Sequence, residues 1–206
     1  IPNLGEQQQM QAIDFEGNQI TAINGLEGMP GLVSLELQGN QIKKIKGLDA
    51  LSKLQVLNLA KNQIAAIEGL DQLENLRELS LAENQIKSIS KLPSLSNLLT
   101  LDLHGNQIEI ISGLYSLKHL VQLFLHANNI SKLEGLSELH DLQVITLGQN
   151  RIQKIEGLSG LEKLQALDLG ENQITRLEGL EHLVNLFVLN LGGNPIPAIP
   201  AIPGSD

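Results

Sequence analysis

The segment from Leu32 to Lys53 reads LVSLELQGNQIKKIKGLDALSK and is one copy of a unit that recurs along the chain. Aligned on their shared asparagine, the copies follow the pattern Leu-x-x-Leu-x-Leu-x-x-Asn-x-Ile-x-x-Ile-x-Gly-Leu-x-x-Leu-x-x, with a period of 22 residues. The asparagine occurs nine times at this spacing: Asn18, Asn40, Asn62, Asn84, Asn106, Asn128, Asn150, Asn172 and Asn194. A fixed period of this length indicates a solenoid, in which each unit forms one coil and packs on its neighbours.

Each unit predicts a short strand followed by a return path. Apolar and polar residues alternate through Leu35, Glu36 and Leu37, so the leucines face the interior and Glu36 faces outward. From Ile42 to Leu54 the apolar residues recur every three positions, a spacing that fits tight helical turns or an extended path. We therefore predict an α/β solenoid with right-handed coils, a parallel concave β-sheet of about nine strands, and short helical or extended convex segments.

The asparagine column is predicted to be structural. A polar residue that recurs among leucines is expected to be buried, and a buried amide needs hydrogen-bond partners. Its side chain can pair with backbone groups left open where each strand ends, so we expect all nine asparagines to form a ladder through the stack. A glycine column is interpreted as backbone geometry or close packing of coils: Gly25, Gly47, Gly69, Gly113, Gly135, Gly157 and Gly179.

The repeats predict one domain over residues 1–206, with a partial first repeat at 1–9, a main array at 10–194 and a proline-rich end at 195–206. Ile1 and Leu4 are in register with Ile23 and Leu26 one repeat later, so the chain opens in mid-repeat. At the other end, prolines at exposed template positions blunt the last edge against further strand pairing.

The amino-acid composition limits the classes of binding partner and the cellular compartment that we expect. Hydrophobic residues make up 42% of the chain but aromatic residues only 2%, so the core must be aliphatic. The absence of cysteine excludes a disulfide framework and a cysteine nucleophile, and it favours a cytoplasmic location. The net charge of -9 disfavours nucleic acid and anionic membranes and favours a basic partner.

The repeat resembles that of the leucine-rich-repeat family. The 22-residue unit with an Ile-x-Gly-Leu phrase is similar to the subclass typified by the leucine-rich-repeat regulatory subunit of type-1 protein phosphatase. This phrase, or its Leu-initiated variant, occurs at Ile67-Glu68-Gly69-Leu70, Ile155-Glu156-Gly157-Leu158 and Leu177-Glu178-Gly179-Leu180. The resemblance implies a non-enzymatic protein–protein interaction module, such as a scaffold or a phosphatase regulator.

Three alternatives remain open. The ending at 194–197, Asn-Pro-Ile-Pro, is similar to the close of repeat arrays in Roco multidomain GTPases, which implies a sensing domain of a larger protein. A bacterial surface adhesion protein of internalin type is the second, although internalin repeats usually carry Asp-Ile-x-Pro-Leu. The lack of insertions over eight full periods also fits a consensus or engineered array.

In this family the ligand usually lies on the concave sheet, at the third, fifth, seventh and eighth positions of each repeat. These columns hold one basic residue, Lys61, and eight acidic residues: Asp14, Glu16, Glu36, Glu78, Glu83, Asp102, Asp168 and Glu171. The predicted partner-binding residues are the fifth column and two histidines of the seventh: Asp14, Glu36, Asn58, Ser80, Asp102, His104, Phe124, His126, Thr146, Asp168 and Asn190. The basic residues on one flank of the coils could bind an anion, but they are interpreted as solvated surface: Lys43, Lys44, Lys87, Lys132, Lys154 and Arg176.

Phe124 is the sharpest of these predictions, because it is the one aromatic residue in the four columns. An outward phenylalanine on a polar sheet contributes little to folding, which favours a binding anchor. The alternative is that its ring packs on neighbouring concave side chains.

Catalytic and metal readings of the same region are weaker. Asp102, His104 and His126 provide metal-ligand types, but two outward histidines lack the surrounding groups that orient ligands. A triad of Ser80, His104 and Asp102 lacks an oxyanion hole. We therefore expect no enzyme activity, no metal and no cofactor, and we expect the partner to be a protein or peptide with basic and apolar character.

Overall fold

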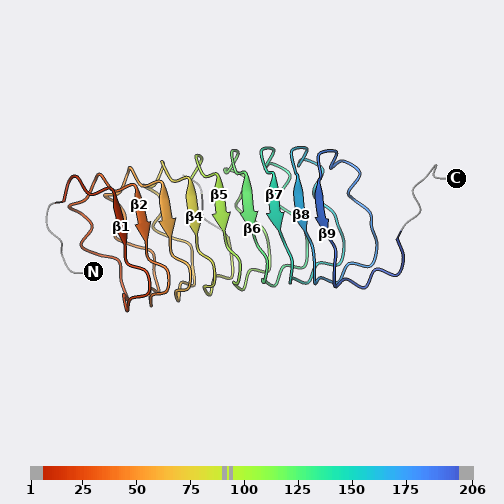
Figure 1. The fold of residues 1–206 in the computed structure, drawn as a ribbon, viewed down its shortest axis with the longest axis horizontal. Helices are drawn as coiled ribbons and strands as arrows, with labels where there is room; N and C mark the ends of the chain where they lie inside the picture. Colours follow the sequence, from red (N-terminus) through yellow and green to blue (C-terminus); the bar gives the residue numbers. More distant parts are fainter. Residues whose placement is uncertain (1–6, 90–91, 93–94, 200–206) are drawn as a thin grey trace.

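The structure is a computed structural model that describes residues 7–89, 92 and 95–199. It contains a nine-stranded parallel sheet in which the strands follow one another in chain order (Figure 1). Parts of the predicted first repeat and of the proline-rich end, residues 1–6 and 200–206, lie outside the described residues. The strands are β1 (Ala12–Asp14), β2 (Ser34–Glu36), β3 (Val56–Asn58), β4 (Glu78–Ser80), β5 (Thr100–Asp102), β6 (Gln122–Phe124), β7 (Val144–Thr146), β8 (Ala166–Asp168) and β9 (Val188–Asn190).

The strand register equals the repeat length. Leu101 of β5 pairs with Leu123 of β6, and Leu123 pairs with Ile145 of β7. Residues that share a template position therefore form a row across the sheet, one residue from each coil. The predicted parallel sheet is confirmed, and the sequence columns can be read directly as rows of neighbouring side chains.

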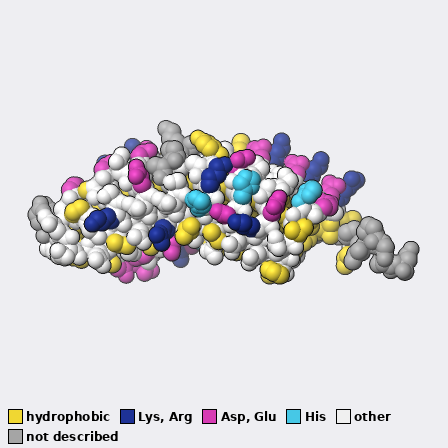
Figure 2. Space-filling view, turned by 90° about the horizontal axis from the view of Figure 1, so that it is seen from above, with side chains coloured by type: hydrophobic (Ala, Val, Ile, Leu, Met, Phe, Trp, Pro, Cys, Tyr) yellow, Lys and Arg dark blue, Asp and Glu magenta, His cyan; other side chains and the backbone are white. Residues whose placement is uncertain are grey.

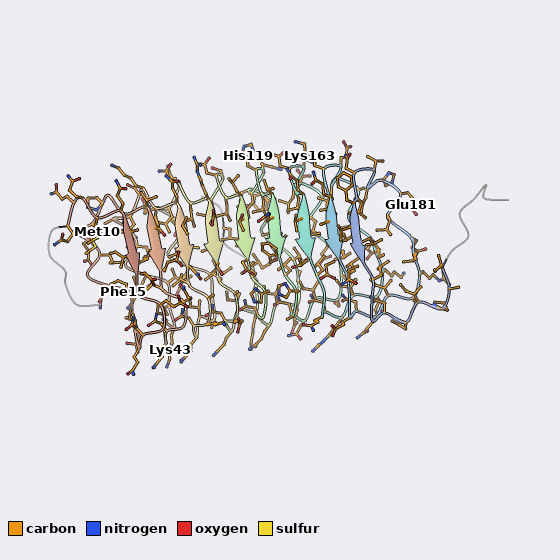
Figure 3. The ribbon with its side chains drawn as sticks, viewed as in Figure 1. Met10, Phe15, Lys43, His119, Lys163 and Glu181 are labelled. Carbon is orange, nitrogen blue, oxygen red and sulfur yellow. The ribbon has the colours of Figure 1, made fainter. Side chains whose placement is uncertain are left out.

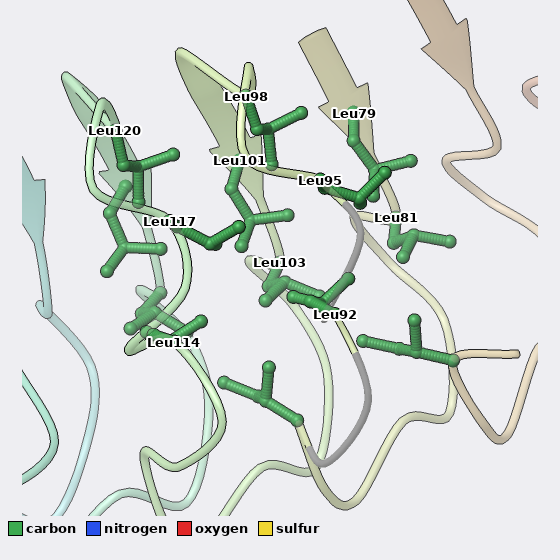
Figure 4. Packing of buried hydrophobic residues seen from close by; sticks show 14 of the residues in the cluster. Leu79, Leu81, Leu92, Leu95, Leu98, Leu101, Leu103, Leu114, Leu117 and Leu120 are labelled. Carbon is green, nitrogen blue, oxygen red and sulfur yellow. The ribbon is translucent and has the colours of Figure 1, made fainter. Parts of the chain in front are cut away.

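One continuous aliphatic core fills the coils. Leu123 and Leu125 point inward from β6 and are fully buried, at 0% exposure. The leucines of the return path, such as Leu114, Leu117 and Leu120, close the same coil from the opposite side (Figure 4). Burial of one leucine side chain stabilises a fold by about 1.5–3 kcal/mol, so a single coil depends on its neighbours to cover both of its flat sides.

The convex return path consists of successive tight turns. Leu117 N donates to Leu114 O at 2.9 Å, and Leu120 N donates to Leu117 O at 3.0 Å. These three-residue steps explain why the apolar residues recur at every third position. Among the described residues there is no helix, and hence none long and apolar enough to cross a membrane. The solenoid is therefore confirmed, but the convex side of its described coils consists of turns and not of short helices.

The asparagine side chains join each coil to the preceding one. Asn106 Nδ2 donates to Leu103 O of its own coil and to Leu81 O of the preceding coil, both at 3.0 Å. Asn106 Oδ1 accepts from Ile86 N at 3.0 Å. The asparagines from Asn40 to Asn172 are all buried, whereas Asn18 is exposed.

The glycines of the predicted column lie where the backbones of adjacent coils approach closely. Gly135 has a φ of +71°, and a Cβ atom there would lie 2.5 Å from Ile111 O of the preceding coil. Any side chain would therefore meet backbone as well as adopt an unfavourable φ. The lack of space for a Cβ atom therefore explains why glycine recurs at this position of the repeat.

Candidate binding face

The strands place one row of variable side chains on the concave face, by which we mean the sheet face turned away from the core. In β6, Phe124 lies between the buried residues Leu123 and Leu125 and is itself half-buried. Its partners across the sheet are Asp102 and Thr146. The eleven residues predicted from the sequence lie on this face; Asp14 and Asn190, on the outermost strands, are exposed, and the other nine are half-buried.

Phe124 borders a hollow on the N-terminal half of the face. The hollow has a volume of about 210 Å³ and spans β2 to β6. Glu36, Asn58, Ser80 and Asp102 line it together with Phe124. Phe124 is half-buried, so part of its ring is exposed beside these side chains. We call this site the phenylalanine hollow.

Two stacked histidines lie at the carboxyl ends of β5 and β6. The ring centroids of His104 and His126 are 4.4 Å apart, and the ring planes differ by 7°. His104 Nδ1 lies 2.8 Å from Asp102 Oδ1, and His126 Nδ1 lies 2.9 Å from Thr146 Oγ1. A hydrogen bond on each side of the pair therefore fixes the orientation of both rings.

The environment of the stack favours a neutral His126. Burial, followed by the nearby His104, lowers the pKa of His126 below its usual value. The carboxylates of Asp102 and Asp168 act in the opposite direction but do not compensate. The partly buried site and the neighbouring His104 therefore disfavour protonation of His126.

The stacked geometry does not assemble a metal site or a triad. Both Nδ1 atoms already have partners, and parallel rings do not converge on one ion. Within the described part of the chain, no group of three or more His, Cys, Asp or Glu side chains is placed to hold a metal. His104 contacts Asp102 and lies 3.8 Å from Glu83 Oε1, and no hydrogen bond between His104 and Ser80 is found in the described residues.

A second hollow lies on the C-terminal half of the concave face. After β7 and β8, the seventh template position is occupied by Gly148 and Gly170, where β5 and β6 are followed by His104 and His126. Both glycines are buried. The two glycines line a hollow with a volume of about 260 Å³, which we call the glycine hollow. Its lining residues are His126, Thr146, Gly148, Gln149, Asp168, Gly170, Glu171 and Asn190.

Two carboxylates border the glycine hollow. Asp168 Oδ1 accepts from Gly170 N at 2.9 Å and from Asn190 Nδ2 at 2.8 Å. Glu171 Oε2 accepts from Gln149 Nε2 at 3.2 Å. The residues that line the hollow include no lysine and no arginine, so its local charge is negative.

Sequence reasoning did not identify the glycine hollow. The available signal was the change in the seventh column from two histidines to Gly148, Gly170 and Gly192. It also missed Ile110 and Tyr115 on the convex side, which are 56% and 65% exposed. Their signal was an apolar residue in columns that are mostly charged or small elsewhere.

Charged pairs occupy the edge where the strands begin. Lys163 Nζ lies 2.7 Å from Asp141 Oδ1, and His119 Nδ1 lies 3.2 Å from Asp141 Oδ2. The hydrogen bonds from Lys163 and then His119 lower the pKa of Asp141. Figure 2 shows basic, acidic and histidine side chains interspersed on this edge. In Figure 3, Lys43 lies at the opposite edge, away from His119 and Lys163.

The basic residue of the concave columns is itself paired. Lys61 Nζ lies 3.5 Å from Glu83 Oε1 on the next coil. Exposed pairs of this kind contribute little to stability. The pair partly offsets the charge of the one lysine in the four concave columns.

Comparisons with known proteins agree with the geometry. A family described as leucine-rich repeats (2 copies) matches residues 52–94 and 96–138, and a second leucine-rich-repeat family matches residues 125–174 and 141–196. The two families together match more than half of the chain. A search of curated protein sequences finds no match.

Several solved structures are similar. An internalin C2 of Listeria monocytogenes is 32% identical, with a TM-score of 0.82, over 87% of this chain and 80% of that chain. An internalin (inlF) of the same organism is 29% identical, with a TM-score of 0.77, over 93% of this chain and 63% of that chain. A leucine-rich-repeat protein of Leptospira interrogans is 31% identical, with a TM-score of 0.79, over 92% of this chain and 56% of that chain. The chain therefore spans less than two thirds of the last two proteins.

Proposed function

Because the chain belongs to the leucine-rich-repeat family, we propose that it is a protein-binding module that holds a protein or peptide against its concave face. The observation that carries this proposal is the row of half-buried, accessible and mutually different side chains around Phe124. Such a row contributes little to the fold and offers a partner an aromatic anchor with a polar surround.

The charge of the face supports a partner with basic and apolar character. Eight acidic residues stand against one basic residue in the four concave columns, and that residue, Lys61, pairs with Glu83. Association with a basic partner is then steered electrostatically and slows as salt rises, because screening acts within roughly 8–10 Å at physiological ionic strength.

The test compares two phenylalanines. The immobilised chain is exposed to an extract of its native cell, together with the variants Phe124→Ala and Phe187→Ala. Phe187 is 81% exposed but precedes β9 outside the concave row, so it controls for the loss of an aromatic ring. A partner held by the parent and by Phe187→Ala, and bound about 30-fold more weakly by Phe124→Ala, supports the proposal. Equal capture by all three proteins contradicts it.

Nucleic acid is the competing class of partner. The structure of a TLR13 complex with single-stranded RNA has a TM-score of 0.74, but it is 23% identical over 90% of this chain and 33% of that chain. This likeness supports the fold alone. Binding of RNA or duplex DNA at physiological salt, weakened by substitution of Lys44, Lys132 and Lys154 but not of Asp102 and Asp168, would overturn the choice of a protein partner.

The cellular setting is also a proposal. A cytoplasmic scaffold or phosphatase regulator is supported by the Ile-x-Gly-Leu phrases and the absence of cysteine. The bacterial surface alternative is supported by the two internalins at 29% and 32% identity, and the Roco alternative by the Asn194-Pro195 ending. The full open reading frame separates the three, because a signal peptide with a wall anchor, or a GTPase domain, would be visible in it.

A further inference from the structure

We propose that the glycine hollow is the seat of one arginine side chain of the bound partner. This proposal rests on the proposed function in one respect, because it assumes that the partner is a protein. It goes beyond that function because it assigns a residue type to a place on the face that the sequence did not single out.

The shape of the hollow fits a flat group. His104 covers one face of the His126 ring, and the glycine hollow lies on the other side of that ring, toward β7. The floor is formed by Gly148 and Gly170, and the Asn190 side chain lies beside Gly170, since a Cβ atom there would lie 2.7 Å from Asn190 Nδ2. An aromatic wall above a glycine floor admits a planar group that stacks on the ring, which is how a guanidinium packs on aromatic side chains.

The hydrogen-bonding groups of the hollow fit a cation. Asp168 Oδ1 already accepts two hydrogen bonds, from Gly170 N and Asn190 Nδ2. Both oxygens of this carboxylate adjoin Gly148, because a Cβ atom there would lie 3.3 Å from Oδ2 and 3.4 Å from Oδ1. With Glu171 also on the border, the hollow presents carboxylate oxygens to the fork of donors of an arginine, which pairs with carboxylates through parallel hydrogen bonds.

The chain provides a charge-matched comparison for Asp168. Glu156 is exposed and lies outside the four concave columns, and it is not among the residues that line the glycine hollow. Glu156→Gln removes one negative charge, as Asp168→Asn does. A difference between the two variants therefore reports the hollow and not the net charge alone.

The experiment is a titration of the folded chain followed by the amide signals of Gly148 and Gly170 in nuclear magnetic resonance spectra. The probes are the acetylated, amidated forms of arginine, lysine and citrulline. Citrulline has nearly the shape of arginine but no charge. We expect saturable shifts of both glycine amides with the arginine probe, weaker binding of the lysine probe, and no saturable shift with citrulline.

Three variants decide the outcome. Asp168→Asn is expected to weaken binding of the arginine probe at least about tenfold, or roughly 1.4 kcal/mol. Gly148→Ala is expected to weaken it as well, because the added Cβ would lie 3.3 Å from Asp168 Oδ2 and crowd that carboxylate. Glu156→Gln is expected to bind like the parent. Equal binding by Asp168→Asn and Glu156→Gln, equal binding of arginine and lysine, or shifts spread over the whole acidic face would overturn the proposal. Because the probe is a single residue, these results are independent of the Phe124→Ala capture experiment.

Discussion

The interior and the concave face are built from alternate residues of the same strands, yet they vary to very different degrees. The central residue of each of the nine strands is leucine or isoleucine, while the next residue is Asp, Glu, Asn, Ser, Phe or Thr. The interior must fit the coils on either side, whereas the concave residue meets solvent. The comparison teaches that the fold fixes one set of positions and leaves the other free for recognition.

The largest contrast is expected between two adjacent residues of β6. Leu123→Ala should lower the free energy of unfolding by about 2–5 kcal/mol, because it removes fully buried atoms and leaves a cavity. Phe124→Ala should lower it by no more than about 1 kcal/mol, because the ring lies outside the core. Denaturant unfolding of both variants measures the difference. If the two midpoints fell equally, the assignment of strand faces would be wrong.

A second contrast concerns two glycines with positive φ. Gly135→Ala should cost about 2–4 kcal/mol, because the added Cβ would lie 2.5 Å from Ile111 O in addition to the unfavourable φ. Gly105→Ala should cost only about 1–2 kcal/mol, since its Cβ would meet the flexible Glu83 side chain at 3.1 Å. Ala127, at the same template position with a φ of 54°, shows that this turn accepts a Cβ. Thermal or denaturant unfolding distinguishes the two, and a larger loss for Gly105→Ala would contradict the steric explanation.

The asparagine ladder gives a third comparison. Asn106→Ala should cost about 1–3 kcal/mol, because Leu81 O, Leu103 O and Ile86 N each lose a hydrogen bond in the interior. Gln107→Ala, at the exposed next residue, should change stability by less than about 0.5 kcal/mol. Coincident denaturation curves for the two variants would show that the ladder does not stabilise the stack.

The smallest expected effect is on the pH dependence of stability. The pKa of His126 is lowered in the folded chain from its usual value of 6.5. Below that pH the unfolded chain binds a proton that the folded chain resists, so this group's contribution to stability falls as the pH drops through 6.5 toward the folded value. His126→Asn should therefore lose less thermal stability than the parent between about pH 7 and about pH 5.5. A greater loss in the variant would reverse the sign and contradict the burial argument.

Much of the fold could be predicted from the sequence because the repeat states it nine times. The strand positions, the parallel order and the faces of Leu123 and Phe124 all follow from period and alternation. The sequence does not distinguish two conformations of the convex path, since a three-residue apolar spacing fits both a helical turn and an extended chain.

The details of the binding face were less predictable. The stack of His104 on His126 depends on side-chain torsions and on bonds to Asp102 and Thr146, none of which the column pattern encodes. The glycine hollow depends on how the side chains of His126, Asp168 and Asn190 are arranged around Gly148 and Gly170. That arrangement is set by three neighbouring coils and cannot be read from one column of the sequence.

Because each repeat adds one strand to the sheet, side chains on the concave face are spaced at regular intervals across the strands. Neighbouring strands are spaced by about 4.8 Å, so Phe124 on β6 and Asp168 on β8 are separated by roughly 10 Å across the sheet. An extended segment advances about 3.3 Å per residue. A partner segment that crosses the strands and uses both hollows therefore carries its apolar residue and its arginine about three positions apart, and inserting one whole repeat between β6 and β8 would lengthen that spacing by one or two residues.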